Sequence, residues 1–360
     1  MTKITTSRPA AMSRRRLMQT GSGLFALGLA APWVGRAHAA VENELIFAGT
    51  GGITQKLIEQ EIFPAFAANH GGLRLTYVSS PTSENVAKLR TQRGTPSIDV
   101  IWLAGAQTYQ VADEGLVAEL DIGRMPNAQN IPAERRTESR SLPLGNTTAG
   151  LLYNERIFKE KGLQPPTSWF DMWDPKYRAH TGMLNIGSTS TVATLPLLAK
   201  ALGSDPYDFD AAFAKLGKLR ANVYDFFTAS GPMDTMVQSG DLWMWSHIAA
   251  RAMQYQNSGF PARFVTPKEG AVGYSASLGI VKNAPHINAA YAWLDYLYTP
   301  GVQQKLAEVI GYTPVVPGIE IAEALREFHP APDKIFIPDM RRMQTLLPDL
   351  VQRWNREVEG

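Results

Sequence analysis

Three consecutive segments between residues 44 and 115 each have the pattern of a strand, a short turn and a helix. Their strands are expected at residues 44–48, 73–78 and 98–103. Strands that alternate with helices favour a parallel sheet, because each helix returns the chain to the same end of the sheet. Ligands of such sheets bind at the carboxyl ends of the strands, so we expect the three turns to line one edge.

The three turns carry residues that suit contact with a polar ligand. Backbone N–H groups at a glycine turn before a helix point toward whatever lies above it. The alternative for the first turn is that glycine is needed only for its backbone dihedral angles. The candidate ligand-binding residues in this part of the chain are Thr50, Gly51, Gly52, Ser80, Gly105 and Gln107.

Further strands are expected at residues 148–153, 181–185, 223–227 and 242–245. Four consecutive hydroxyl residues, 188–191, stand at the start of a helix, which is more than capping requires and suits a carboxylate or phosphate. Trp245 ends a strand, where it can enclose a ligand or pack in a core. The candidates here are Ser188, Thr189, Ser230 and Trp245.

Residues 263–282 read as a strand, a Pro/Gly turn, a small-residue segment and an apolar strand at 278–281. We interpret this stretch as a hinge crossing in which Tyr274 and Ser275 face the ligand. Residues 312–317 form a further crossing, and residues 340–358 form a helix. We therefore expect one lobe from residues 40–145 plus 270–312 and another from 146–269 plus 313–360, closing on a ligand by hinge bending.

Residues 1–39 have the pattern of an export signal. Arginines 14–16 precede an apolar run at 21–34 and a small-x-small site ending at Ala39. This order predicts a secretory signal peptide of the twin-arginine type, cleaved after Ala39. The alternative is a membrane anchor, but the apolar run is shorter than the ~20 residues that cross a bilayer. We expect a soluble periplasmic protein.

Charge and cysteine content exclude several classes of function. Six of the 35 basic residues and none of the 33 acidic residues lie within residues 1–39, which leaves 29 basic against 33 acidic residues. A nucleic-acid partner is not expected, because phosphate binding needs a concentrated basic face. The absence of cysteine excludes disulfides, thiolate metal sites and a lipid-modified cysteine.

The order of several short motifs resembles the periplasmic solute-binding proteins of ABC importers, in particular the spermidine/putrescine-binding branch. The resemblance covers nearly all of the chain after the export signal, and it depends on order and spacing, not on any single motif. The motifs are Gly51-Gly52, Leu152-Tyr153-Asn154, Pro166-Thr167-Ser168-Trp169, Trp173-Asp174-Pro175-Lys176-Tyr177, Pro267-Lys268-Glu269-Gly270 and Gly311-Tyr312-Thr313-Pro314.

The resemblance implies an α/β, two-lobed type II periplasmic binding protein fold. Each lobe would be a mixed sheet flanked by helices, with the ligand cleft between the lobes. It also implies a membrane permease as partner, no catalysis and no cofactor, and we expect a monomer. Polyamine binders of this branch carry an aromatic residue and, two positions later, an aspartate; the corresponding residues here are Tyr274 and Ala276. They also carry carboxylates near the start of the helix that here follows Gly187, where this sequence has serine and threonine and no acid.

The ligand class remains open between three chemistries. Without the aspartate, we expect a zwitterionic or carboxylate-bearing amine of the γ-aminobutyrate type, because a buried diammonium ion needs carboxylate partners. Ferric ion and phosphonates are the alternatives within the same fold. A secreted hydrolase is the enzyme alternative, since Gly273–Ser277 lacks one residue of the G-x-S-x-G pattern.

Overall fold

Ten strands form one mixed sheet in which two parallel groups are joined by two long antiparallel strands. The structure is a computed structural model, and it describes residues 42–136 and 138–360. The strand order is β2-β1-β3-β9-β4-β7-β5-β6, with β10 beside β9 and β8 beside β4. The predicted signal peptide at residues 1–39 lies outside the described residues.

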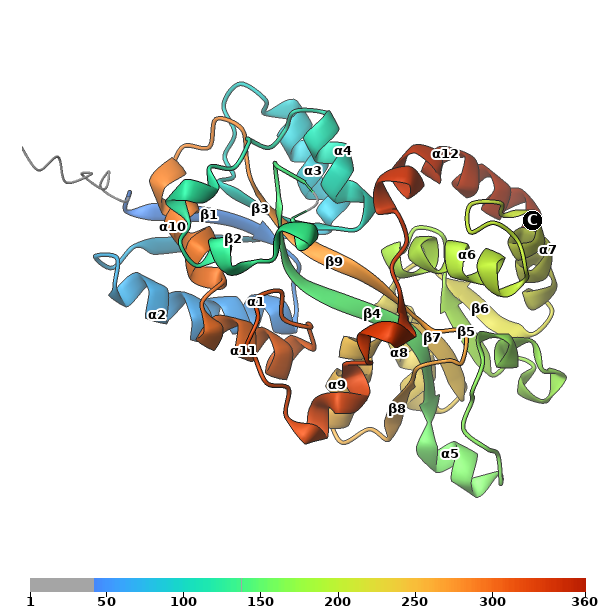
Figure 1. Cartoon of the computed structure of the whole chain (residues 1–360). Coiled ribbons are helices and arrows are strands. Elements are labelled where there is room, and N and C mark those ends of the chain that lie inside the picture. Colours follow the sequence, from blue (N-terminus) through green and yellow to red (C-terminus); the bar gives the residue numbers. More distant parts are fainter. Residues whose placement is uncertain (1–41, 137) are drawn as a thin grey trace, which may run out of the picture. The chain divides into compact units, whose positions relative to one another are not determined.

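The strands have these bounds: β1 Glu44–Gly49, β2 Arg74–Ser79, β3 Val100–Ala104, β4 Leu142–Asn154, β5 Thr181–Leu184, β6 Val223–Phe227, β7 Met244–Ile248, β8 Ala262–Val265, β9 Ala271–Ile280 and β10 Ile335–Phe336. The first group is β2-β1-β3 and the second is β7-β5-β6, each of them parallel throughout. Strands β4 and β9 run side by side between the two groups (Figure 1).

The α-helices are α1 Ile53–Leu57, α2 Phe63–Ala68, α3 Thr82–Thr91, α4 Ala106–Asp113, α5 Glu155–Glu160, α6 Thr189–Ala201, α7 Asp210–Leu219, α8 Ser230–Ser239, α9 Ala249–Asn257, α10 Ile287–Leu297, α11 Pro300–Ile310 and α12 Met340–Glu357. A π-helical turn, Ile58–Ile62, joins α1 to α2. The 3₁₀-helices are Ile122–Arg124, Ala128–Asn130, Ala133–Arg135, Trp169–Trp173, Pro175–Tyr177, Glu323–Phe328 and Pro332–Lys334.

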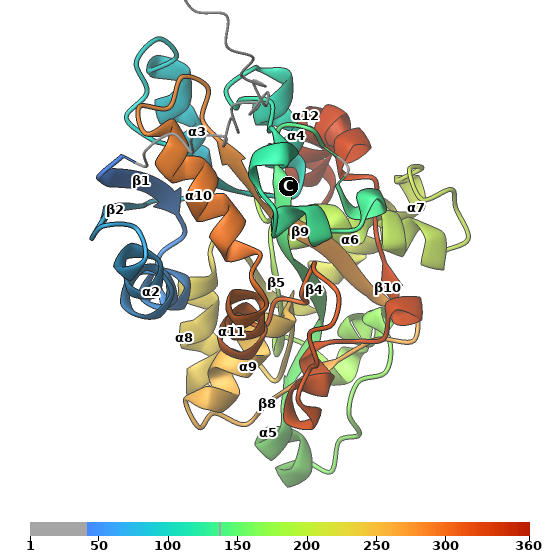
Figure 2. The ribbon, with the colours of Figure 1, turned by 60° about the vertical axis from the view of Figure 1, so that its left-hand side comes forward.

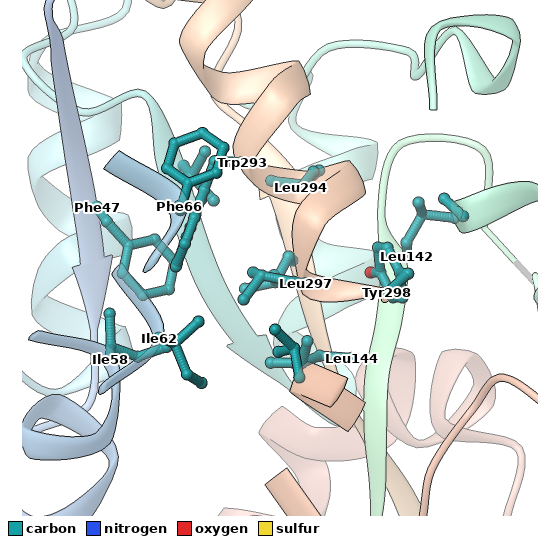
Figure 3. Close-up of a cluster of buried hydrophobic side chains, with 14 of the residues drawn as sticks. Phe47, Ile58, Ile62, Phe66, Leu142, Leu144, Trp293, Leu294, Leu297 and Tyr298 are labelled. Carbon is teal, nitrogen blue, oxygen red and sulfur yellow. The ribbon is translucent and has the colours of Figure 1, made fainter. Parts of the chain in front are cut away.

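Strands β1 and β3 of the first parallel group are largely buried on both faces, whereas β2 is a partly exposed edge strand. Successive side chains of a strand point to opposite faces. In β1, Leu45 and Phe47 enter the cluster drawn in Figure 3, while Ala48 enters a second cluster under α3 and α4. An apolar run such as Val100–Ala104 is therefore expected here, because a parallel strand covered by helices on both sides needs no polar face.

Two more hydrophobic clusters cover the second parallel group. One contains residues of α6, α7 and α12, and Trp354 lies in it with no exposed surface. The other contains residues of α8 and α9 together with Leu152 from β4. Strand β9 contributes Val272 to the first of these clusters and Leu278 to the cluster of Figure 3, so one strand packs in the cores of both groups.

Side-chain caps fix two helix starts that the sequence indicates. The Asn154 side chain accepts a hydrogen bond from the backbone N–H of Ile157 and begins α5, as its residue type favours. Ser168 and Asp171 form a capping box that begins the 3₁₀-helix Trp169–Trp173. Both helices are short, and their first residues are set by these local bonds.

The structure corrects the sequence interpretation of residues 270–282. We expected a small-residue segment followed by a strand at 278–281, whereas β9 is one continuous strand from Ala271. Gly273, Ser275 and Ser277 have low β propensity, but pairing with β4 supplies the backbone partners that hold them extended. In the same way β4 begins at Leu142, and β7 spans Met244–Ile248 instead of 242–245.

After α11 the chain contributes again to both hydrophobic clusters of the second group, through Phe328 in the cluster with α8 and α9 and through residues of α12 in the cluster with α6 and α7. Strand β10 pairs with β9 in parallel, and α12 follows it (Figure 2). Arg341 in the first turn of α12 pairs with Asp113 at the end of α4. The division into lobes at residues 145/146, 269/270 and 312/313 stays a prediction.

We expect Trp293→Ala to lower the free energy of unfolding by about 3–5 kcal/mol, because the cavity left in the core cannot be filled. The Trp293 ring has no exposed surface and lies 5.2 Å from the ring centroid of Phe66 and 5.4 Å from that of Phe63. Urea denaturation followed by circular dichroism measures the change.

The matched control is Trp243→Ala, which removes an indole that is only half-buried. Trp243 stacks on the His180 ring at 3.6 Å, with Lys161 over it. A loss of stability as large as that of Trp293→Ala would contradict the assignment of Trp293 to the core.

Candidate functional site

A cavity of about 570 Å³ lies beside the paired strands β4 and β9. The strands provide hydroxyl and amide groups to its lining, and the start of α4 and the segment before α12 complete it. The polar lining residues of the two strands and of the residue preceding β4 are Ser141, Asn146, Thr148, Ser275 and Ser277. The cavity is therefore polar along the strands, where backbone pairing holds each side chain in register.

Asn146 and Ser275 are opposite each other in the β4–β9 pair. The Ser275 hydroxyl donates to Asn146 Oδ1 at 2.8 Å. Asn146 also exchanges backbone hydrogen bonds with Thr313, at 2.8 and 2.9 Å, which ties the crossing at 312–317 to the same point of the sheet. Three separate chain segments thus meet at one wall of the cavity.

Two acidic and two basic residues with described side chains line the cavity, namely Glu138, Asp339, Arg135 and Arg341. Arg341 lies 2.7 Å from Glu138 and 2.9 Å from Asp113, and these carboxylates raise the pKa of its guanidinium. Asp339 accepts the backbone N–H of Arg342 and caps α12. The two acidic and two basic side chains of the lining have formal charges that balance.

Three of the residues predicted from the sequence, Gly105, Tyr274 and Ser275, line this cavity. Gly105 donates its N–H to the carbonyl oxygen of Ser275 at 3.3 Å. A Cβ atom added at Gly105 would lie 2.3 Å from Thr189 Cγ2. The turn after β3 and the start of α6 therefore touch, which brings a carboxyl end of each parallel group to the same place.

The other predicted residues of the first parallel group lie outside the lining. Thr50 accepts a hydrogen bond from the Tyr77 hydroxyl at its carbonyl oxygen, and Ser80 accepts one from Lys88. Gly51 and Gly52 are exposed in the turn after β1, and Gln107 is half-buried in the first turn of α4.

Ser188 and Ser230 follow strands of the second parallel group, and they also lie outside the lining. Trp245 is outside it too, and it is the second residue of β7, not the last residue of a strand as predicted. The hydroxyl groups of Ser188 and Ser190 lie 2.8 Å apart. Ser230 lies 3.0 Å from the His247 ring. Trp245 has no exposed surface and packs against Tyr255, so its indole belongs to the core under α8 and α9.

Sequence reasoning overlooked the lining residues Asn146 and Thr148 as well as Tyr312, which lies outside the lining but near Tyr274. Tyr312 packs against Gly145, where an added Cβ would lie 2.7 Å from its ring, and against the Trp102 ring at 5.9 Å. Burial, and secondarily the neighbouring Tyr312 phenol, raise the pKa of Tyr274 above its ordinary value. The sequence signal for Tyr312 was its position in the Gly311–Pro314 motif. Only the fold shows that Tyr312 lies near Tyr274.

The described residues offer neither a metal centre nor a membrane span. Within residues 42–136 and 138–360, no group of three or more His, Cys, Asp or Glu residues could hold a metal ion. None of the helices in this same part of the chain has the length and apolarity needed to cross a membrane.

A family model of bacterial extracellular solute-binding proteins matches residues 61–327. The chain belongs to this family. The family resemblance stated from the motifs is therefore confirmed, and the cavity described above is a candidate solute site of an extracellular solute-binding protein.

Relatives of this solute-binding protein differ in the solute that their names give. The spermidine/putrescine-binding periplasmic protein of Salmonella typhimurium is 28% identical over 346 residues, which cover 91% of this chain and 88% of the relative. A protein of Salmonella typhi, provisionally named as 2-aminoethylphosphonate-binding, is 22% identical over 68% of this chain and 70% of its own.

The fold of this solute-binding protein also occurs in solved structures. An ABC transporter substrate-binding protein from Bradyrhizobium japonicum USDA 110 superposes with a TM-score of 0.75 at 23% identity, covering 88% of this chain and 99% of that one. The predicted α/β fold of periplasmic binding proteins is confirmed by this and similar structures.

We expect Gly105→Ala to destabilise the protein more than Gly52→Ala. Both glycines have positive φ with ψ near −130° (φ 51°, ψ −125° and φ 71°, ψ −137°), which is strained for alanine by about 1–3 kcal/mol. Only at Gly105 does the new Cβ clash, with Thr189, since no atom lies within 4 Å of a Cβ at Gly52.

The double variant Gly105→Ala/Thr189→Ala tests the clash directly. It removes Thr189 Cγ2 and leaves Thr189 Cβ at an ordinary 3.7 Å and the end of the flexible Met340 side chain at 3.0 Å, so most of the excess loss should be recovered. Unfolding free energies of the single and double variants measure the coupling. Independent effects of the two substitutions would mean that these two turns are not in contact.

Proposed function

We propose that this protein is the periplasmic substrate-binding component of an ABC importer, that it captures a small zwitterionic amine, and that it delivers this solute to a membrane permease. The cavity beside β4 and β9, which Gly105, Tyr274 and Ser275 help to line, is the proposed binding region. The protein acts as a carrier in this proposal and performs no chemistry on the solute.

Family membership supports the carrier role. The Salmonella typhimurium relative is named as a periplasmic binding protein, and it is similar over 91% of this chain. The protein from Bradyrhizobium japonicum is named as the substrate-binding protein of an ABC transporter, and it shares the fold. A soluble, exported carrier with two lobes that close on the solute is the arrangement these relatives suggest.

The absence of acid at two positions carries the proposal for the ligand class. The first turn of α6 contains no acidic residue, and Ala276, at the position of the polyamine-binding aspartate, packs in the hydrophobic cluster of Figure 3. A diammonium ion would lose its hydration at these positions without gaining a carboxylate partner. A ligand with one amine and one acidic group needs fewer such partners.

The charged side chains around the cavity favour the same ligand class. Glu138 and Arg341 already pair with each other at 2.7 Å. Asp339 remains near the cavity as a carboxylate that can meet a single ammonium group. One free acid and several hydroxyl groups match one amine and one acidic group better than they match two or more amines.

A phosphonate with an amine is the second candidate, and it belongs to the same chemical class. The relative provisionally named for 2-aminoethylphosphonate carries this possibility. Hydroxyl groups and helix N-termini bind phosphonate oxygens as well as carboxylate oxygens. Ferric ion is less favoured, because burial raises the pKa of Tyr274 and Tyr312 and so opposes the phenolate that a ferric ion requires.

The hydrolase alternative has little support at Ser275. Ser275 is in the middle of strand β9, and its hydroxyl donates to Asn146 of β4. A serine nucleophile needs a sharp strand-to-helix turn and a base within hydrogen-bond reach.

We expect the purified protein to be stabilised by γ-aminobutyrate or 2-aminoethylphosphonate and much less by putrescine or spermidine. A ligand present at ~100 times its dissociation constant adds about 2.7 kcal/mol to the free energy of unfolding. Thermal denaturation against a panel of these compounds, with ferric salts included, measures the preference. Stabilisation by polyamines alone would exclude the proposed ligand class.

Ser188→Asp should shift the preference toward putrescine, because it places a carboxylate at the N-cap of α6. Ser188→Asn is the matched control, since the asparagine side chain has the shape of aspartate without its charge. We expect at least ~10-fold tighter putrescine binding in the Asp variant than in the Asn variant. Equal affinities would indicate that Ser188 lies away from the solute.

A further inference from the structure

Among the four charged residues with described side chains that line the cavity beside β4 and β9, two already neutralise each other. Arg341 pairs with Glu138 at 2.7 Å, and it also pairs with Asp113, outside the lining, at 2.9 Å. The other two are Arg135 and Asp339. Within the part of the chain that the structure describes, neither of these two forms an ion pair. One positive and one negative charge of the lining therefore remain for a solute.

Arg135 is held in place through one nitrogen of its guanidinium group. It ends the 3₁₀-helix Ala133–Arg135, and its Nη1 donates to the carbonyl oxygens of Pro314 and Val315, each at 3.3 Å. A guanidinium group has five N–H donors in one plane, two of them on Nη1. The donors on Nε and Nη2 have no partner among the described residues. Their edge of the group suits bidentate binding of a carboxylate or phosphonate.

This anchor places Arg135 at the wall of the cavity where three chain segments meet. Pro314 follows Thr313, which lines the cavity and exchanges backbone hydrogen bonds with Asn146. The Asn146 Oδ1 atom accepts from the Ser275 hydroxyl at 2.8 Å, while its Nδ2 has no partner among the residues that the structure describes. The wall therefore offers unpaired N–H donors from a cation and from an amide.

Asp339 provides an acceptor from a different segment, the one that precedes α12. Its Oδ1 accepts the backbone N–H of Arg342 at 2.9 Å, and its own backbone N–H donates to the Tyr207 hydroxyl at 2.7 Å, so two hydrogen bonds fix its position. Its Oδ2 has no partner among the described residues. A carboxylate that caps a helix with one oxygen keeps its negative charge, and the other oxygen can accept from an ammonium group.

We infer that Arg135 binds the acidic group of the solute and that Asp339 binds its ammonium group, so that the two unpaired charges of the cavity set both the class of the solute and its direction. This inference rests on the proposed function. It makes Arg135 the residue that selects against polyamines, because a guanidinium repels the second ammonium group that a diamine would bring to this end of the cavity.

The selection acts at short range. Arg135 and Asp339 are both exposed residues of the lining, so solvent and salt screen their charges from distant groups. Contact at hydrogen-bond distance, where a bidentate guanidinium–carboxylate pair is strongest, provides most of the preference.

A comparison of γ-aminobutyrate with its neutral amide, γ-aminobutyramide, tests the role of Arg135. The two compounds have the same length and the same amine, and they differ in the charge of the other end. We expect wild-type protein to bind γ-aminobutyrate about 10-fold or more tightly than the amide in isothermal titration, because the amide forms no charge-assisted pair with a guanidinium. In Arg135→Met this preference should largely disappear.

Two further variants control this measurement. Arg135→Lys keeps the positive charge without the planar arrangement of donors, so it should recover only part of the preference. Arg136→Met changes the same residue type at the next position, which lies outside the lining, and it should keep the wild-type preference. The affinity for 2-aminoethylphosphonate should follow the same order among these variants. Thermal denaturation without ligand shows that each variant is folded.

Asp339→Asn tests the other end of the solute. Asparagine keeps an oxygen that can cap α12, but it loses the charge. We expect the affinity for γ-aminobutyrate to fall about 10-fold, because a charge-assisted bond to the amine is lost. Butyrate, which has no amine, should bind the variant and the wild type equally weakly. The preference for γ-aminobutyrate over its amide should survive in Asp339→Asn.

The outcomes separate this inference from the proposed function. If Arg135→Met and Arg136→Met kept the same preference for γ-aminobutyrate over its amide, or if wild type had no such preference, Arg135 would not bind the acidic group, while γ-aminobutyrate would remain a ligand. Loss of the preference in Asp339→Asn and not in Arg135→Met would contradict the direction of the solute. Failure of both γ-aminobutyrate and 2-aminoethylphosphonate to bind would remove the proposed ligand class, and the inference with it.

Discussion

The antiparallel pairing of β4 with β9 is the interaction on which the rest of the structure depends. Each parallel group has only three strands of its own, and each is completed by one of these long strands, β9 beside β3 and β4 beside β7. Strand β9 also contributes side chains to the hydrophobic clusters of both groups. The pairing of β4 with β9 therefore fixes how the strands of one group are placed relative to those of the other. The cavity lies beside this pair, so the register of the β4–β9 pairing determines where the polar side chains of its lining stand.

The strand–turn–helix order of residues 44–115 was predictable because burial on both faces of a parallel sheet leaves a strong apolar signal. Local caps such as Asn154 were equally readable, since the bond joins residues three apart. The strand character of Gly273–Ser277 could not be read, because small residues extend there only through pairing with a strand that lies far away in the sequence.

The candidate site likewise contains residues with a local sequence signal and residues whose positions depend on distant contacts. Gly105, Tyr274 and Ser275 were found because each stands at a turn or beside a motif, and all three line the cavity. Asn146 and Tyr312 were overlooked because their positions come from contacts across the fold, with Ser275 in one case and with Tyr274 in the other. An aromatic residue in a strand, such as Trp245 in β7, gives no local sign of whether it is buried.

The pairing of β3 with β9 has a consequence for the order in which the chain can fold. Residues 100–104 have no neighbour on that side until residues 276–280 have been synthesised. Non-local pairing of this kind raises contact order and slows folding, since a long loop must close before the contact forms. Most of this chain must therefore be synthesised before its central sheet can be completed.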